Sequence, residues 1–140
     1  MPLAGEQLTY GWALALDYYV GWRGKDLITS VALMCAESAR YTLAWHENLN
    51  EDATVVLSTD WGLFQINDKA HPDLELPEDY NNGIANAKFA HQIYKDHGKS
   101  FNAWAAYNSG AYLKFVPAVT AAWVLPRWRL KVENVEKKFA

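Results

Sequence analysis

The sequence has almost no cysteine, since Cys35 is the single one among 140 residues. A lone cysteine excludes an internal disulfide, and the composition fits synthesis in a reducing cytoplasm. Cys35 falls within a segment predicted to be a buried helix, where an unpaired cysteine acts as a small apolar side chain. We therefore expect no covalent crosslink within the fold.

Long apolar runs and excess positive charge are also missing. Residues 12–20 are interrupted by Asp17, and the first ten residues contain an acid but no basic side chain. A membrane span needs roughly 20 apolar residues, and a secretory signal begins with basic ones. The formal net charge of −3 gives no indication of nucleic-acid binding. We expect neither a signal peptide, nor stable membrane insertion, nor a nucleic-acid partner.

The four histidines lack the spacing of metal ligands. His46 has no nearby histidine or cysteine, and His71, His91 and His97 belong to other predicted elements. Zinc sites usually draw their ligands from closely spaced pairs. All four are predicted to be structural, and the sequence predicts no metal and no cofactor.

What the sequence does contain indicates a single domain over residues 1–140. A chain of 15.9 kDa can bury roughly two-thirds of its unfolded surface. Hydrophobic residues make up 51% of the chain, and seven residues are tryptophan. The tryptophans either fill the core or provide aromatic surface of the kind on which sugar rings stack.

The most apolar helix is predicted over residues 27–40. Almost every residue between 29 and 39 is apolar or small, which is typical of a helix buried on all sides. Glu37 is the exception, and at helical spacing its neighbours are Leu33, Met34 and Tyr41. An apolar environment favours the protonated form of a glutamic acid, which can then serve as a general acid. The alternative is that Glu37 turns outward to water at the helix end.

Other elements surround this helix. A first amphipathic helix is predicted over residues 8–22, and Asp26 is expected to open the central one. Residues 48–52 are predicted to be the turn of a hairpin, whose second strand begins at 54–57 and delivers Ser58, Thr59 and Asp60. Further helices are predicted over 83–97, with Gly98 at its end, and over 118–125. Asp60 thus supplies a second carboxylate, and paired carboxylates are typical of glycoside hydrolysis.

Three sequence blocks resemble the motifs of the lysozyme-like superfamily. They are Glu37-Ser38, residues 58–67 with the sequence S-T-D-W-G-L-F-Q-I-N, and residues 102–110 with the sequence N-A-W-A-A-Y-N-S-G. The block at 58–67 is most similar to c-type lysozymes, whereas the block at 102–110 mixes their N-A-W with the Y-N-x-G of lytic transglycosylases. The blocks cover roughly residues 25 to 115. Animal c-type enzymes differ from this chain because they carry disulfides.

The resemblance implies an α+β, mainly α fold with two lobes, a small β-hairpin lobe and a central buried helix. It also implies peptidoglycan as the substrate, Glu37 as the catalytic acid and Asp60 as the second catalytic carboxylate. Trp104 is expected to pack against Glu37 and exclude water from it. The residues expected to bind substrate are Ser58, Thr59, Trp61, Gln65, Asn67, Ala103, Trp104, Tyr107 and Asn108.

Three functions remain open at this point. A muramidase is favoured because lytic transglycosylases of this superfamily generally lack an acid that matches Asp60. A transglycosylase, which releases 1,6-anhydro sugars, is the nearest alternative. A non-catalytic saccharide-binding module of a virion is the third, although both carboxylates argue against it.

The expected setting is a bacteriophage endolysin or a virion-associated wall enzyme. Without a signal peptide, such an enzyme would remain in the host bacterial cytoplasm until a holin released it. We expect a monomer.

The C-terminal segment is basic. Residues 127–140 carry net +3 and could touch an anionic wall polymer, but we favour a terminal helix exposed to solvent.

Overall fold

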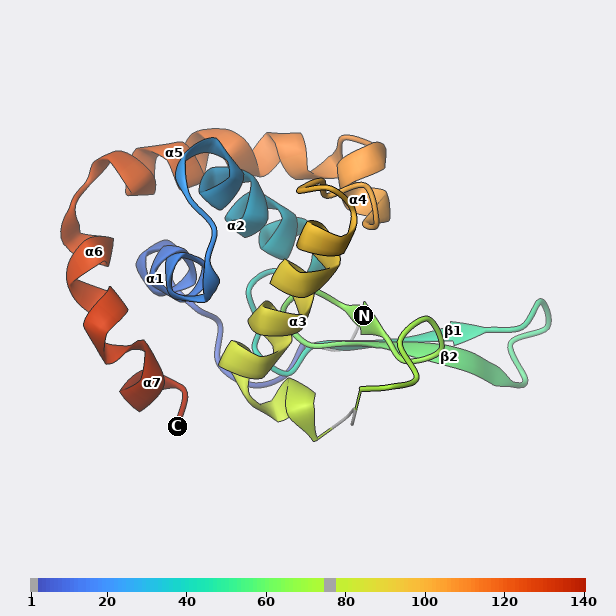
Figure 1. The fold of residues 1–140 in the computed structure, drawn as a ribbon. Helices are drawn as coiled ribbons and strands as arrows, with labels where there is room; N and C mark the ends of the chain where they lie inside the picture. Colours follow the sequence, from blue (N-terminus) through green and yellow to red (C-terminus); the bar gives the residue numbers. More distant parts are fainter. Residues whose placement is uncertain (1–2, 75–77) are drawn as a thin grey trace.

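Helices account for most of the protein, and one small sheet projects from them (Figure 1). The computed structural model describes residues 3–74 and 78–140. In chain order the elements are α1 Tyr10–Val20, α2 Gly24–Ser38, β1 Trp45–Leu49, β2 Val56–Trp61, β3 Ile66–Asn67, η1 Asp79–Asn81, α3 Gly83–Asp96, α4 Ala105–Asn108, η2 Ala111–Phe115, α5 Val116–Val124, α6 Arg127–Lys131, η3 Val132–Asn134 and α7 Val135–Lys138. The expected α+β, mainly α fold is confirmed.

Helix α2 is the buried central helix that its composition predicts. It contacts α1, α4, α5 and the 3₁₀ helix η2, and the stretch from Thr29 to Cys35 is buried throughout. It begins at Gly24, two residues before Asp26, and ends at Ser38 where Ala39 turns into the left-handed region. Glu37 therefore lies in its last turn, one residue before the helix ends.

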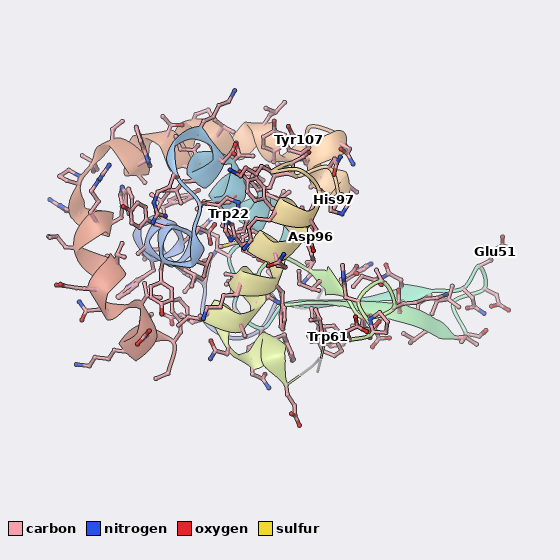
Figure 2. All side chains as sticks on the ribbon, viewed as in Figure 1. Trp22, Glu51, Trp61, Asp96, His97 and Tyr107 are labelled. Carbon is pink, nitrogen blue, oxygen red and sulfur yellow. The ribbon has the colours of Figure 1, made fainter. Side chains whose placement is uncertain are left out.

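The sheet has three antiparallel strands in the order β1-β2-β3. Figure 1 shows the β1–β2 hairpin extending away from the helices, and Figure 2 places Glu51 at its tip. The predicted hairpin exists, but its predicted turn begins too early, because β1 continues to Leu49 and β2 starts at Val56. Asp60 accordingly lies within β2 rather than where the strand becomes a loop. The two-residue strand β3 is too short to show a pattern in the sequence, and it is not among the predicted elements.

Aromatic side chains fill the interior between α1, α2 and α3. Trp22 contacts the rings of Phe64, Tyr94 and Phe101 with centroids 5.4 to 6.0 Å apart, and Figure 2 shows it inside the helical body. Of the seven tryptophans, three are buried and four are partly buried. Five of them lie in the core or pack against it, Trp45 and Trp61 lie in the sheet, and none is fully exposed.

The C-terminal segment differs most from its prediction. We expected a helix exposed to solvent, but residues 127–140 form α6, η3 and α7, which pack against α1. Trp128 and Val135 are buried, and the Trp128 indole contacts Tyr18 with ring centroids 5.4 Å apart. The preceding helix α5 also begins earlier than predicted, at Val116, with Pro117 in its first turn. These apolar contacts, rather than solvation, hold the segment in place.

Asp17 is a buried acid between α1 and α2. Its Oδ2 lies 2.6 Å from the hydroxyl of Ser30, which also lies 2.8 Å from the carbonyl oxygen of Leu27. The Ser30 hydroxyl donates to Oδ2, while Oδ1 of Asp17 is buried without a hydrogen-bond partner, so a negative charge on this carboxyl group is poorly compensated. Burial raises the pKa of Asp17 well above its ordinary value, opposed by the Ser30 hydrogen bond.

Asp17→Asn is expected to raise the free energy of unfolding at pH 8 by roughly 1 to 3 kcal/mol. The amide places a donor where the protonated acid has one. The wild-type protein loses stability as the pH rises above the ordinary aspartate range, because the unfolded acid ionises and the folded one resists. Urea titrations at pH 4 and pH 8 measure this, with the exposed Asp73→Asn as control. An equal effect at both pH values would contradict the prediction.

Candidate functional site

Glu37 enters the site from the last turn of α2, where its side chain is partly buried. Burial raises the pKa of Glu37 to about 7, the negative charge of Asp60 adds to the rise, and the backbone N–H of Ala106 opposes it. Asp60 and Ala106 are far from Glu37 in the sequence, so the fold brings both of them to the acid. A carboxyl group with this pKa is half protonated near neutral pH and can donate a proton there.

Asp60 lies in a polar environment built by the three strands. The Asn67 side-chain amide donates to its Oδ1 over 2.8 Å, and the Asn48 amide donates to its Oδ2 over 3.1 Å. Both amides also donate to the hydroxyl oxygen of Ser58. Strand pairing sets this arrangement, because Asn48 lies opposite Ser58 and Asn67 lies opposite Asp60. Amide donors thus fix the orientation of both oxygens of the Asp60 carboxyl group.

A tight turn connects β2 to β3 and holds Asp60 in position. Gly62 has φ +77°, and a Cβ there would come within 2.3 Å of the Asn86 amide nitrogen. The buried Asn86 side chain donates to Trp61 O and accepts from Phe64 N. Gln65 donates to the backbone oxygens of Ala44 and Gly62. The amide N–H groups of Gln65 thus serve this turn, and substrate binding by Gln65 stays a prediction.

The third sequence block forms the wall next to Glu37. Trp104 is buried, and its indole N–H donates to Phe64 O over 2.9 Å. This bond joins the second block to the third. The contact between Trp104 and Glu37 that the resemblance implies stays a prediction, whereas Ala106, two residues later, does act on Glu37.

Tyr107 and Asn108 have separate roles. Tyr107 is partly buried and stacks on Tyr112 with ring centroids 5.1 Å apart, in the position that Figure 2 labels. Asn108 is exposed and donates to Asn102 O over 2.8 Å. Tyr107 thus supports the wall, while the Asn108 amide closes the loop that precedes α4. A role for either residue in substrate binding stays a prediction.

A small pocket of about 110 Å³ gathers four of the predicted substrate-binding residues. They are Gln65, Asn67, Ala103 and Trp104. His71 is also in the lining. Asn67 contacts both this pocket and Asp60, so the pocket directly adjoins the carboxylate. The rest of the lining includes Ile66, Ile93 and Trp104, so the pocket suits a small apolar group such as a methyl.

Thr59 and Trp61 make structural hydrogen bonds at the base of the hairpin. The backbone N–H of Thr59 and the indole N–H of Trp61 both donate to the carboxylate of Asp68, over 3.0 and 3.3 Å. Trp61 also contacts Tyr80 with ring centroids 4.7 Å apart. Both residues therefore fix the base of the hairpin, and substrate contacts by them stay predictions.

Three contributors to the site are absent from the sequence-based prediction. Asn48 is predicted in a turn, Asn86 in a helix without a site role, and Ala106 acts through a backbone N–H that has no side-chain signal. If the first strand of the hairpin had been predicted to reach Leu49, Asn48 would have been placed opposite Ser58. Because side chains alternate along a strand, Asn48 would then have been expected on the same face as Ser58 and Asp60. Asn86 carries no such signal, because only the fold brings it to the turn.

Among the described residues, neither a metal cluster nor a membrane-spanning helix accompanies this site. Within residues 3–74 and 78–140, no three His, Cys, Asp or Glu side chains are grouped so as to hold a metal ion. In that part of the chain no helix combines the length and the apolar character needed to cross a bilayer.

Comparison with known proteins gives one match. The model of a family described as a lysozyme-like domain matches residues 14–106. This range contains both carboxylates, the three strands and Trp104. No curated protein and no solved structure matches the chain.

Proposed function

Because the chain belongs to the lysozyme-like family, we propose that it is a muramidase acting on peptidoglycan. The bond cleaved would be the β-1,4 linkage between N-acetylmuramic acid and N-acetylglucosamine. The observation that supports this most is the contrast between the two carboxyl groups. Glu37 has a pKa of about 7 through burial, whereas Asp60 accepts amide N–H groups on both oxygens.

The two groups divide the reaction between them. Protonated Glu37 donates its proton to the glycosidic oxygen as the C1–O bond breaks, and the bonding electrons leave with that oxygen. Ionised Asp60 either forms a bond to C1 or stabilises its developing positive charge. Water then attacks C1 and returns a proton to Glu37, which restores the enzyme.

The pocket next to Asp60 would orient the bound sugar. Its apolar lining from Ile66, Ala103 and Trp104 would accept the methyl of the N-acetyl group of one sugar. Holding that group beside Asp60 would set C1 near the carboxylate, and such positioning lowers the barrier without taking part in bond changes.

The alternative is a lytic transglycosylase, because membership of the family is compatible with both reactions. In that reaction Glu37 acts first as acid and then as base, and the 6-hydroxyl of the sugar attacks C1 in place of water. Mass analysis of muropeptides tests the choice. Reducing-end products support the muramidase, whereas predominantly 1,6-anhydro products would overturn it. Absence of any product from intact walls would support a non-catalytic saccharide-binding module.

Asn48→Ala is expected to lower kcat by about ten-fold, equivalent to about 1.4 kcal/mol of barrier. The change removes the amide donor to Oδ2 of Asp60, so the carboxyl group is held less firmly in its reactive orientation. Initial rates on purified peptidoglycan measure kcat and KM, and melting temperatures check the fold. Asn81→Ala, at an exposed position of η1, is the matched control and should keep full activity. A higher KM with an unchanged kcat would show that Asn48 does not position Asp60 for the reaction.

A further inference from the structure

A groove of about 720 Å³ lies between α1 and the C-terminal helices. Trp12 of α1 forms one wall, and the other carries Arg127, Lys131, Lys137 and Lys138. The described residues that line it include four cations and no acid. Figure 1 places α6 and α7 at the end of the helical body that faces away from the hairpin. We call this feature the basic groove.

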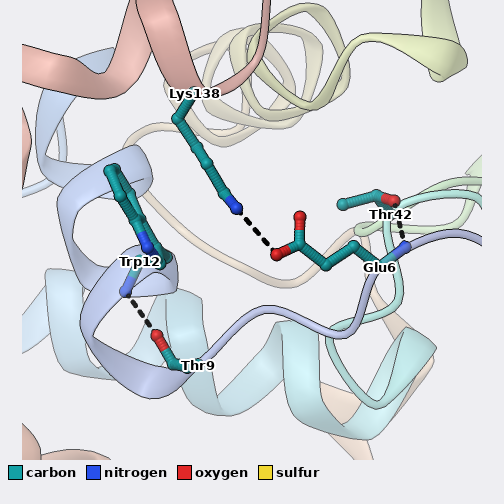
Figure 3. A network of polar contacts seen from close by, with 5 residues as sticks. All are labelled: Glu6, Thr9, Trp12, Thr42 and Lys138. Atoms are coloured by element: carbon teal, nitrogen blue, oxygen red, sulfur yellow. Dashed lines mark hydrogen bonds and ion pairs between the residues drawn. The ribbon is translucent and has the colours of Figure 1, made fainter.

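Trp12 holds two of the ammonium groups close together. Lys131 Nζ lies 4.9 Å and Lys138 Nζ 5.3 Å from the Trp12 ring centroid, so the two nitrogens are no more than about 10 Å apart. Lys138 also pairs with Glu6 over 2.7 Å, as Figure 3 shows. Glu6 offsets the charge of Lys138, so Lys131 is the ammonium group beside Trp12 that has no counter-charge among the described residues.

The other cations of the groove are free to bind an anion. Across the part of the chain that the structure describes, Lys138–Glu6 is the only ion pair. Arg127, Lys131 and Lys137 therefore have no acidic partner among those residues. Residues 127–140 carry net +3, whereas residues 1–126 carry net −6. The positive field is thus local to the groove and opposite in sign to the rest of the protein.

We infer that the basic groove binds a linear polymer with phosphate groups along its length, such as the polyol phosphates of a bacterial wall. The concave shape favours a chain over a membrane, because a flat bilayer surface cannot reach the floor of a groove. Several cations in succession match repeated phosphates, and each contact weakens as salt rises. Leu130, 74% exposed at the groove, can contact the polyol carbons.

The test uses a fluorescently labelled poly(glycerol phosphate) chain and the whole protein, with binding followed by anisotropy at low salt. The variant replaces three groove cations with glutamine, Arg127→Gln, Lys131→Gln and Lys137→Gln. Lys138 is kept so that its ion pair with Glu6 continues to hold the C-terminal segment. We expect the dissociation constant to rise at least ten-fold, with an unchanged melting temperature.

A matched control removes the same charge elsewhere, through Lys25→Gln, Lys88→Gln and Lys95→Gln, all at exposed positions. It should bind within about three-fold of the wild type, since these side chains lie outside the groove. Equal losses in both variants would overturn the inference in favour of a general charge effect. Binding only to phosphatidylglycerol vesicles, and not to the polymer, would overturn it in favour of a membrane surface. Because the readout is binding, the outcome does not depend on the proposed muramidase activity.

Discussion

Glu37→Gln is expected to lower the rate of peptidoglycan cleavage by about 10²- to 10⁴-fold. The amide has the shape of the protonated acid but cannot give a proton to the glycosidic oxygen. Turbidity loss of purified cell walls measures the rate, and circular dichroism checks that the fold is intact. Glu51→Gln, at the hairpin tip (Figure 2), removes the same charge outside the site and should keep full activity. Clearing by Glu37→Gln at a substantial fraction of the wild-type rate would remove Glu37 from the mechanism.

The pH dependence gives a further readout for the same variant. Because burial and Asp60 raise the pKa of Glu37 to about 7, wild-type activity should fall as the pH rises through 7 and the acid ionises. Stability should change in the same direction. Ionisation is easier in the unfolded chain, so the wild type loses stability from the ordinary glutamate range up to about pH 7, and Glu37→Gln does not. Unfolding curves at pH 5 and pH 8 should therefore separate the two proteins more at pH 8 than at pH 5.

Asp60→Asn is expected to lower kcat by about 10²- to 10³-fold if the protein is a muramidase. The neutral amide can neither attack C1 nor stabilise its positive charge. It should also move the alkaline limb of the pH–activity profile to lower pH, because the charge of Asp60 contributes to the raised pKa of Glu37. Initial rates from pH 4 to 9 measure both, with the exposed hairpin residue Asp52→Asn as control.

A transglycosylase would respond differently to this change. The N-acetyl group of the sugar and Glu37 would be sufficient, so Asp60→Asn would cost about ten-fold or less, equivalent to about 1.4 kcal/mol. The asparagine also brings an amide against the donors of Asn48 and Asn67, so melting temperatures must accompany the rates. A small loss together with 1,6-anhydro products would replace the muramidase proposal with the alternative.

The central helix and its acid were predictable from local sequence. An almost continuous apolar stretch from residue 29 to 39 has one position where an ionisable group interrupts it, and Glu37 is that position. Helix α3 was likewise bounded by visible signals, because Asn82 caps its start and Gly98 follows its end. These features depend on residues within one or two turns of each other.

The features that the sequence did not predict depend on distant residues. Asn86 reaches the Gly62 turn from 24 positions away, and Asn48 reaches Asp60 from across the sheet. The helical character of the C-terminal segment was predicted, but its packing on α1 was not. Its charges are visible in the sequence, whereas the surface of α1 that buries Trp128 and Val135 is not. A short amphipathic stretch shows which side chains are apolar, but it does not show whether a partner surface exists.

The packing of α6 and α7 on α1 has a consequence for the order of folding. Contacts between residues more than 100 positions apart close slowly, because the chain between them must first lose conformational freedom. During synthesis α1 emerges more than 100 residues before the helices that cover its Trp128- and Val135-facing surface. The nascent chain therefore carries an uncovered apolar helix face until residues 127–140 emerge, and during that interval it is most open to aggregation.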